Sequence, residues 1–528
     1  MTKFLKTGVS QLKENRFFVI FSLFIVLVAQ YMIEYKESIW PKIYILLIIF
    51  VIFFLGLLLA PNRVDKLARN CFILIFFLGS TNSLILPIRQ NLDENTHYFY
   101  TLQLADGNLT SQTDEKNFLL VSPDFLAITK LPSKPEYGSP NNTNLYTKEF
   151  HQLLNIKSEY KEKYIQKTGL INPAYIPSAI GVKLGQLISN RLFVSYYLGR
   201  IFNVLFYALL AFWAIKISKY YQIQLFVMSL LPFVTWIASG YSYDSLYYGL
   251  VLLILAQFTN FLGEDKSFTF KRGIFYALSC LCLIFCKAPV ILLIFLPLFL
   301  SRQKFDTIRT YWLNFLSISM AGLLGILWLG QVSIMKLLGH TSSVVAKTSE
   351  VSSPTVSRLT YFIEHPIYTA EMVLRSLFDI PATILDTLSR PQPFMPGTQV
   401  LSAINMVSFV IILIIISGQL TIEISKKMRY IIIVLFFIIS LAIMYAISGD
   451  PRVFKVGDLH IAGVQGRYHY YILVFLPLLL APVIKNRILF ARASSISAVN
   501  SEKVSVNIVK LVTLLTVVNT CVALYAYF

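Results

Sequence analysis

The sequence predicts an all-α polytopic membrane protein with about 13 transmembrane helices. Of the 528 residues, 56% are hydrophobic and 14% are charged, whereas a soluble globular chain carries roughly 25% charged residues. Apolar runs such as residues 43–60 are long enough to cross about 30 Å of hydrocarbon at about 1.5 Å per residue. Because no water in the bilayer core pairs a free backbone amide, such runs must be helices.

The apolar runs define the predicted helices in chain order. They lie at residues 17–33, 43–60, 70–88, 192–215, 222–239, 243–263, 272–286, 288–300, 311–331, 401–418, 429–447, 468–484 and 506–527. Residues 272–300 also allow one bent helix, with Lys287 and Pro289 at the bend. The chain divides into an N-terminal helix pair (1–69), a core (70–331) with a long outer loop (89–191), a second outer loop (332–400) and C-terminal helices (401–528).

The charge distribution argues for membrane lipids and against nucleic acid as the partner of the basic residues. The net charge is +19, but Lys and Arg fall in short segments between the apolar runs and form no basic stripe. If the N-terminus is cytoplasmic, most of these residues lie inside, as the positive-inside rule requires. Both long hydrophilic segments then lie outside. The five cysteines fall in or at the ends of apolar runs and suggest neither disulfides nor a zinc site.

Acidic residues follow the third predicted helix in the sequence NLDENTHYFY. Asp93, Glu94 and His97 are either solvated loop residues or a site in which a carboxylate acts as general base or metal ligand. The residues that follow predict a short amphipathic helix on the surface, which would hold the acids in place. A second outer acid, Asp244, stands beside Tyr243 in a tight turn. It is typical of a helix N-cap, and that helix N-terminus also favours bound phosphate.

Three basic residues occupy apolar surroundings and need partners. Lys287, in FCKAPV, costs roughly 2.5–3.5 kcal/mol at mid-bilayer, so it either reaches the interface or binds an anion. Arg200, in LGRIFN, lies within a predicted helix. Arg467 either anchors the interface or grips a phosphate with two hydrogen bonds. Its neighbours Gln465, Tyr468 and His469 are further candidates for a donor site. Walker, serine-elbow and dinucleotide motifs are absent from the sequence.

Several motifs together resemble a known family. DENTH, NPAYIPSAIG, SYD, CKAP and GVQGRYHYYILVFLPLLL are similar to the bacterial membrane proteins catalogued as domain of unknown function 2142. That family is grouped with the GT-C superfamily of polyprenyl-phosphate-dependent glycosyltransferases, and the similarity spans roughly residues 70–485. It implies a GT-C-like helical bundle in a bacterial plasma membrane, working on the extracytoplasmic face.

The resemblance also implies roles for particular residues. Asp93, with Glu94 beside it, corresponds to the catalytic acid of the first outer loop, and Asp244 to a second outer acid. Lys287 and Arg467 would bind the donor phosphate, with Arg200, Gln465 and His469 also assigned to the donor site and His97, Tyr243 and Tyr468 to the pocket. Some GT-C members use a divalent metal, so Mg²⁺ or Mn²⁺ on Asp93 and Asp244 stays open.

Three functions follow as hypotheses. The favoured one is transfer of a sugar from a polyprenyl-phosphate donor to a cell-surface glycan or glycolipid. The second is a metal-independent polysaccharide polymerase or ligase that relies on arginine and histidine, and the third is a flippase or transporter of lipid-linked glycans. In the first, the segment 332–400 is expected to form a lid that faces the acceptor.

Overall fold

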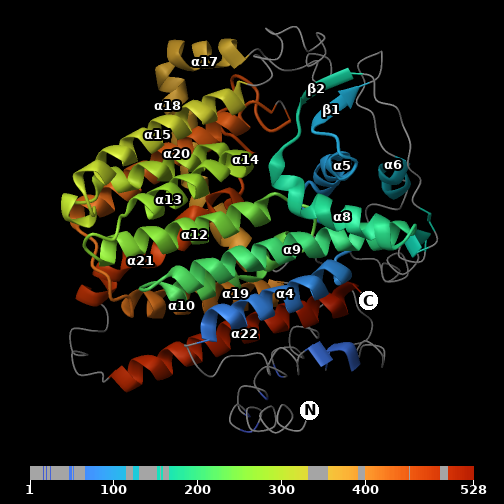
Figure 1. The fold of residues 1–528 in the computed structure, drawn as a ribbon, viewed down its shortest axis with the longest axis horizontal. Helices are drawn as coiled ribbons and strands as arrows, with labels where there is room; N and C mark the ends of the chain where they lie inside the picture. Colours follow the sequence, from blue (N-terminus) through green and yellow to red (C-terminus); the bar gives the residue numbers. More distant parts are fainter. Residues whose placement is uncertain are drawn as a thin grey trace.

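The computed structural model describes the greater part of the chain, and in this part the chain is predominantly helical (Figure 1). The expected helices at 17–33 and 43–60, which make up the N-terminal pair, lie largely outside the described residues. The described residues are 66–113, 123–129, 152–154, 156–157, 166–330, 355–390, 399–450, 452–487 and 498–527, with scattered positions among residues 13–52.

Nine helical stretches of the described chain are long and apolar enough to cross a membrane. The prediction of a multi-pass membrane protein is therefore confirmed. Eleven of the 13 predicted helices fall largely on described residues, and ten of these correspond to the nine stretches. They are α4 (Leu67–Ile85), α9 (Leu192–Ile217), α12 (Asp244–Gly263), the stretch Phe270–Phe299, α15 (Ile308–Leu329), α19 (Gln399–Gly418), α20 (Lys426–Ile447), α21 (Tyr470–Arg487) and α22 (Ala498–Tyr527).

The helix predicted at residues 222–239 is broken into two pieces. α10 (Gln222–Ser229) ends before Leu230, and α11 (Pro232–Ala238) begins at Pro232. Proline has no N–H to donate to the preceding turn and is favoured in the first turn of a helix. Each piece is too short to count as a membrane span, which is one reason for the lower number of stretches.

The stretch Phe270–Phe299 is a hairpin of two short helical segments. The Tyr276 hydroxyl donates a hydrogen bond to the carbonyl oxygen of Leu293 at 2.7 Å. In one continuous helix these two residues would lie about 25 Å apart. The chain therefore turns back near Lys287, which decides the question in favour of two segments. They are α13 (Phe270–Cys282) with α14 (Ile284–Lys287) on one side and the 3₁₀ helix η3 (Ala288–Phe299) on the other.

The first predicted outer loop folds into small elements at one end of the bundle (Figure 1). The predicted short helix is present as α5, but most of its residues are buried, so it is not a surface helix. β1 and β2 pair in antiparallel fashion, with Thr110 opposite Leu170, where the sequence predicted no strand. The elements are α5 (Glu94–Ala105), β1 (Thr110–Thr113), α6 (Pro123–Thr129), β2 (Gln166–Leu170), η2 (Pro173–Tyr175) and α8 (Ile176–Ile188).

The second hydrophilic segment contributes α17 (Thr355–Glu364) and α18 (Pro366–Ser389). One face of α18 is buried through Met372, Ser376 and Ile380, at the spacing of four residues that a helix face requires. α18 packs against α19 and against η6 (Gly466–His469), the 3₁₀ turn that leads into α21. A further 3₁₀ turn, η4 (Arg302–Lys304), follows the hairpin.

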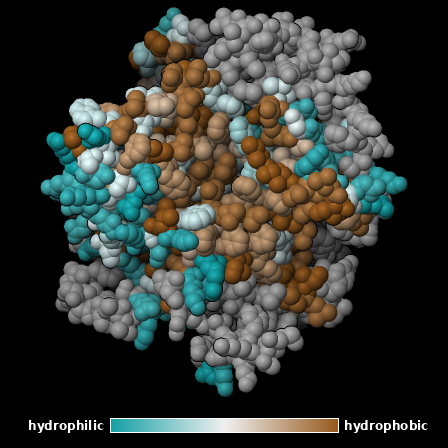
Figure 2. All heavy atoms as spheres, in the orientation of Figure 1, coloured by the Kyte–Doolittle hydropathy of each residue, from teal (hydrophilic) through white to brown (hydrophobic). Residues whose placement is uncertain are grey.

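α12 is the central helix of the bundle. Nearly all its residues are buried, and it packs against α9, α13 and α21. Figure 2 shows apolar side chains spread across the middle of one face of the molecule, with hydrophilic residues gathered at its left edge. This is the distribution expected for helices that present apolar surface to lipid and polar ends to water.

Candidate functional site

Four separate chain segments meet at the end of the bundle where α12 begins. They are the turn between α4 and α5, the turn between α11 and α12, the tip of the hairpin at α14, and η6. Each segment contributes one charged side chain, Asp93, Asp244, Lys287 and Arg467 in chain order, and we call these four residues the ion cluster. All four were singled out from the sequence.

Arg467 joins the two carboxylates of the ion cluster. Its Nη2 lies 2.7 Å from Oδ2 of Asp93, and its Nη1 lies 3.4 Å from Oδ2 of Asp244. The Nζ atom of Lys287 lies 3.0 Å from Oδ1 of Asp244. The cluster therefore contains two positive and two negative charges in contact, drawn from positions up to 374 residues apart in the chain.

The cluster is buried on one side and open on the other. The side chains of Asp244 and Arg467 are 1% and 4% exposed, whereas that of Asp93 is 64% exposed. Asp93 also has a left-handed backbone conformation, with φ of 56°, which Asp and Asn tolerate better than most residues. Asp93 is thus the member of the cluster that an entering molecule reaches first.

Aromatic rings surround the two cations. Nζ of Lys287 lies 4.1 Å from the ring centre of Tyr468 and 4.8 Å from that of Tyr243. The Arg467 guanidinium lies 5.1 Å from the Tyr468 ring centre. These distances are within the range of cation–π attraction. The rings stabilise both positive charges while leaving their N–H groups available to an anion.

His97, on α5, contacts the tyrosine rings near the two cations. Its Nδ1 is 2.9 Å from the Tyr175 hydroxyl, and its ring packs edge-on against Tyr243. Burial lowers the pKa of His97 to about 4, against an effect of Asp244 in the opposite direction. The imidazole is therefore neutral at pH 7 and takes no part in the charge balance of the ion cluster.

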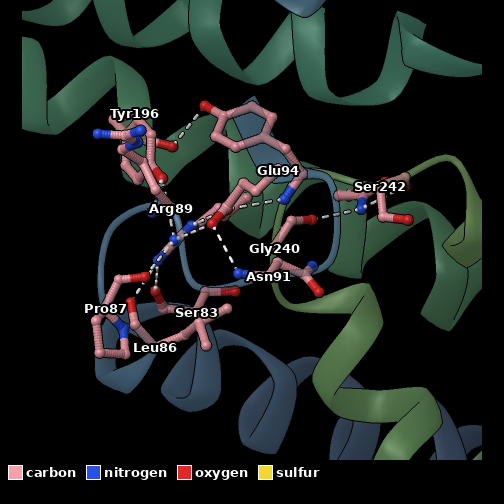
Figure 3. Close-up of polar contacts among 12 residues, drawn as sticks. Ser83, Leu86, Pro87, Arg89, Asn91, Glu94, Tyr196, Gly240 and Ser242 are labelled. Atoms are coloured by element: carbon pink, nitrogen blue, oxygen red, sulfur yellow. Dashed lines mark hydrogen bonds and ion pairs between the residues drawn. The ribbon is translucent and has the colours of Figure 1, made fainter. Parts of the chain in front are cut away.

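Glu94, the residue after Asp93, forms a buried ion pair with Arg200. Nε and Nη2 of Arg200 each lie 2.8 Å from one carboxylate oxygen of Glu94, and both side chains are at most 1% exposed. Figure 3 shows Glu94 between the turn that carries Leu86 and Asn91 and the turn that carries Gly240. The remaining partners are Ser83, Leu86, Pro87 and Tyr196 for Arg200, and the backbone N–H groups of Asn91 and Tyr241 for Glu94.

This pair corrects two expectations from the sequence. Glu94 was expected beside Asp93 as a catalytic acid, and Arg200 as a residue of the donor site. Both are closed off from the open side of the cluster, because their hydrogen-bonding groups are engaged with each other and with backbone. They are positioning residues that fix the two turns from which Asp93 and Asp244 project.

Close packing of the two turns adds to this fixation. Asn91 donates from its side chain to the carbonyl oxygen of Ile237 at 2.9 Å. A Cβ atom at Gly240 would lie 2.1 Å from Nδ2 of Asn91, a distance at which one of the two must move. Glycine at this position therefore allows the α4–α5 turn to lie directly on the α11–α12 turn.

The other candidates from the QGRYH sequence are placed differently. Gln465 lines a cavity of about 470 Å³ beside Arg467. His469 is fully buried, with Nδ1 3.3 Å from the Tyr471 hydroxyl inside the bundle. The structure thus brings Gln465 and Tyr468 to the site and directs His469 into the helical core.

The donor set does not fit a divalent metal between Asp93 and Asp244. Arg467 lies between the two carboxylates, and Lys287 contacts the second. A cation bound there would have to displace both basic side chains from their partners. In the described residues no group of three or more His, Cys, Asp or Glu is arranged to hold a metal.

A profile of the family described as "Predicted membrane protein (DUF2142)" matches residues 76–479. The match covers most of the chain and includes all four members of the ion cluster. The chain belongs to the DUF2142 family. No curated protein and no solved structure matches this DUF2142 protein.

Sequence reasoning missed several residues at the site of this DUF2142 protein. Asn172 of the NPAY motif donates from its side chain to the carbonyl oxygen of Phe285, next to the hairpin tip, and Tyr175 of the same motif contacts His97. From the sequence, this motif supported only the family resemblance and predicted no site residue. Trp236 and Thr383 line the cavity beside Arg467, and no local sequence signal distinguishes them from core and loop residues.

Removing the negative charge of Glu94 should destabilise the protein more than removing that of Asp93. Replacing Glu94 with Gln leaves the Arg200 charge buried without its counter-ion, which costs about 3–5 kcal/mol when one partner of a buried pair is removed. Replacing Asp93 with Asn changes a mostly exposed side chain and should cost far less. Thermal unfolding of the purified proteins in one detergent compares the two variants. Equal melting temperatures would contradict the positioning role of Glu94.

Burial of neutral His97 predicts a loss of stability in acid. Its pKa is about 4 in the folded protein against 6.5 ordinarily, so the unfolded chain binds the proton more readily. The stabilisation is therefore complete above pH 6.5 and is lost as the pH falls toward 4, by about 3 kcal/mol. Between pH 7.0 and pH 4.5, the melting temperature should fall further for the wild type than for His97→Gln. An equal fall in melting temperature for the two proteins would show that His97 does not cause the loss of stability.

Proposed function

We propose that this DUF2142 protein is a GT-C-type glycosyltransferase that moves a sugar from a polyprenyl-phosphate donor to a cell-surface glycan or glycolipid. The observation that carries the proposal is the contact of exposed Asp93 with buried Arg467. A carboxylate able to take a proton stands beside cations able to hold a phosphate, at one end of a bundle of membrane helices. Transfer of a sugar from a lipid phosphate uses both kinds of group in one site.

The reaction forms one bond and breaks one bond at the anomeric carbon, and it transfers one proton. The oxygen of an acceptor hydroxyl attacks the anomeric carbon of the donor sugar and forms the new glycosidic bond. The bond between that carbon and the phosphate oxygen breaks, and its electron pair leaves with the polyprenyl phosphate. Asp93 accepts the hydroxyl proton as general base, while Arg467 and Lys287 stabilise the negative charge that develops on the leaving phosphate.

Charge balance couples donor binding to activation of Asp93. The free ion cluster is neutral, and the arriving phosphate adds negative charge. Asp93 is the most exposed partner of Arg467, so its replacement by phosphate on the guanidinium costs the least. The same exchange frees the Asp93 carboxylate for the acceptor hydroxyl. Asp244 stays in place, since it is buried and also pairs with Lys287.

The distribution of basic residues supports an extracytoplasmic site. α12 leads from Asp244 to Gly263 over about 30 Å, and basic residues gather beyond its far end. There the N–H of Lys266 donates to Gln303 at 2.8 Å, beside Arg302 and Lys304. By the positive-inside rule this pattern favours a cytoplasmic far end, which supports our proposal of an ion cluster on the outer face of a bacterial plasma membrane, with the N-terminus inside as expected from the sequence.

Cysteine labelling checks this orientation. In a cysteine-free background, Asp458→Cys stands at the end of the ion cluster and Lys266→Cys at the opposite end; both positions are exposed. A membrane-impermeant maleimide should label position 458 in intact cells and position 266 only after permeabilisation. Labelling in the reverse pattern would place the site in the cytoplasm and remove the basis for an outer-face transferase.

The second candidate is a metal-independent polysaccharide polymerase or ligase. The observation that favours it is the position of Arg467 between the two carboxylates, because this candidate binds its donor through arginine. It differs from the first candidate in its donor, a glycan on a lipid diphosphate, and in a reduced need for a general base. The flippase hypothesis is less well supported, because the charged residues of the cluster gather at one end of the bundle and not near its middle.

Replacing Asp93 with Asn tests the transferase directly. Asn keeps the size and the left-handed backbone but accepts no proton, so the rate of sugar transfer should fall by roughly 10²–10⁴-fold, with EDTA present throughout because no metal is required. Glu371→Gln, an exposed acid paired with Arg375 on α18, is the matched control and should keep full activity. Membranes supplied with undecaprenyl-phosphate sugars or diphosphate-linked glycans provide the two donors. Full activity of the Asp93 variant would reject the proposed base.

A further inference from the structure

Two cavities extend from the ion cluster along one face of α18. The first, of about 470 Å³, begins at Arg467 and is bounded by Trp236, Thr383 and Thr387. The second, of about 280 Å³, is bounded by Ser376, Asp379 and His460. Thr383, Asp386, Ala462 and Val464 line both cavities. The two cavities are therefore neighbours, and we call them together the α18 groove. The first cavity alone is within the usual size range of ligand sites.

The charged side chains of the groove are already paired with one another. The Asp379 carboxylate contacts the His460 imidazole, and Asp386 forms an ion pair with Arg390 at 2.7 Å. At the head of the groove, Arg467 pairs with Asp93 and Asp244. The charged side chains of the groove thus already have polar partners, and none stands alone to select a phosphate or a cation. These contacts suit an uncharged ligand with many hydrogen-bonding groups.

Hydrogen-bonding groups and apolar surface alternate along the walls. Thr383 and Thr387 project from one face of α18, opposite the apolar side chains of Leu92 and Phe233. The indole Nε1 of Trp236 and the Nε of Arg467 are buried, and neither has a hydrogen-bond partner among the described residues. A buried N–H without a partner is costly, so both donors are available to a ligand in the groove.

Close contact between α18 and η6 places the groove against the ion cluster. A Cβ atom at Gly466 would lie 2.1 Å from the carbonyl oxygen of Thr383 and 2.5 Å from Oγ1 of Thr387. Only glycine allows this approach. Because Arg467 is the next residue, the two threonines and the guanidinium are held at the same end of the groove.

We propose that the α18 groove binds the acceptor glycan, as a neutral chain of sugar residues whose first hydroxyl reaches Asp93. This assignment rests on the proposed glycosyltransferase function and adds the substrate class of the second subsite. Sugar rings offer hydroxyl groups to Thr383, Thr387 and Trp236, and apolar C–H faces to the opposite wall. A lipid chain would leave the buried N–H groups of Trp236 and Arg467 without partners, which makes it the poorer occupant.

Binding measurements on the intact protein test the groove. Detergent-purified protein is applied to a printed array of bacterial surface oligosaccharides, and its binding of undecaprenyl phosphate is measured in parallel. The double substitution Thr383→Val and Thr387→Val keeps side-chain volume but removes both hydroxyl groups. Saccharide binding should weaken about tenfold, as expected for two lost neutral hydrogen bonds, while undecaprenyl phosphate binding stays unchanged.

Two further variants keep the test decisive. Trp236→Phe removes the indole N–H and should also weaken saccharide binding selectively, which covers the case in which the double variant misfolds. Thr369→Val is the matched control: Thr369 lies on α18 outside the groove and donates to Phe362 at 2.8 Å. It should bind both probes like the wild type.

The outcomes separate this inference from the proposed function. If the wild type binds undecaprenyl phosphate but no saccharide, or if both groove variants bind saccharides normally, the groove assignment is overturned and the transferase proposal stands. If the groove variants instead lose undecaprenyl phosphate, the groove holds the lipid donor and not the acceptor. If the wild type binds neither probe, both proposals fail.

Discussion

The pairing of charge in surroundings of low dielectric is the constraint on which this structure depends. Arg467 and Arg200 are both almost completely removed from solvent, and an unpaired charge in such a position costs several kcal/mol. Each arginine therefore requires a carboxylate from a distant part of the chain. Glu94 meets this need for Arg200, and Asp93 and Asp244 meet it for Arg467. Two adjacent acids, Asp93 and Glu94, thus join segments that lie 374 and 106 residues away in the sequence.

The Glu94–Arg200 and Asp93–Arg467 ion pairs differ in solvent exposure. This difference assigns a structural role to the first pair and a role in substrate binding to the second. The Glu94–Arg200 pair is sealed by backbone partners and has no access to a substrate. The Asp93–Arg467 pair has one buried and one exposed member. A buried cation with an exchangeable exposed partner is ready to accept an anion without rearrangement of the bundle. Such preorganisation is what electrostatic stabilisation of a leaving group requires.

α18 links the ion cluster to the surface of the molecule. Its inner face packs through Met372 and Ile380, its flank lines the groove with threonines and paired charges, and its outer face exposes Ile367 and Phe378. A helix with three such faces lies naturally at a boundary between protein, water and lipid. A donor with a lipid tail and an acceptor with a polar chain would meet at such a boundary.

The sequence by itself determined that the chain is a multi-pass membrane protein and which charged residues stand out in it. Length and apolar composition decide helix formation in a bilayer, and a charge inside an apolar run stands out without any tertiary information, as Lys287 and Arg200 do. The pairing of those charges was decided only by the tertiary structure. Glu94 and Arg200 are 106 residues apart, and no periodicity connects them. The hairpin at Lys287 and the groove residues Trp236 and Thr383 follow the same rule, because each depends on which helices pack together.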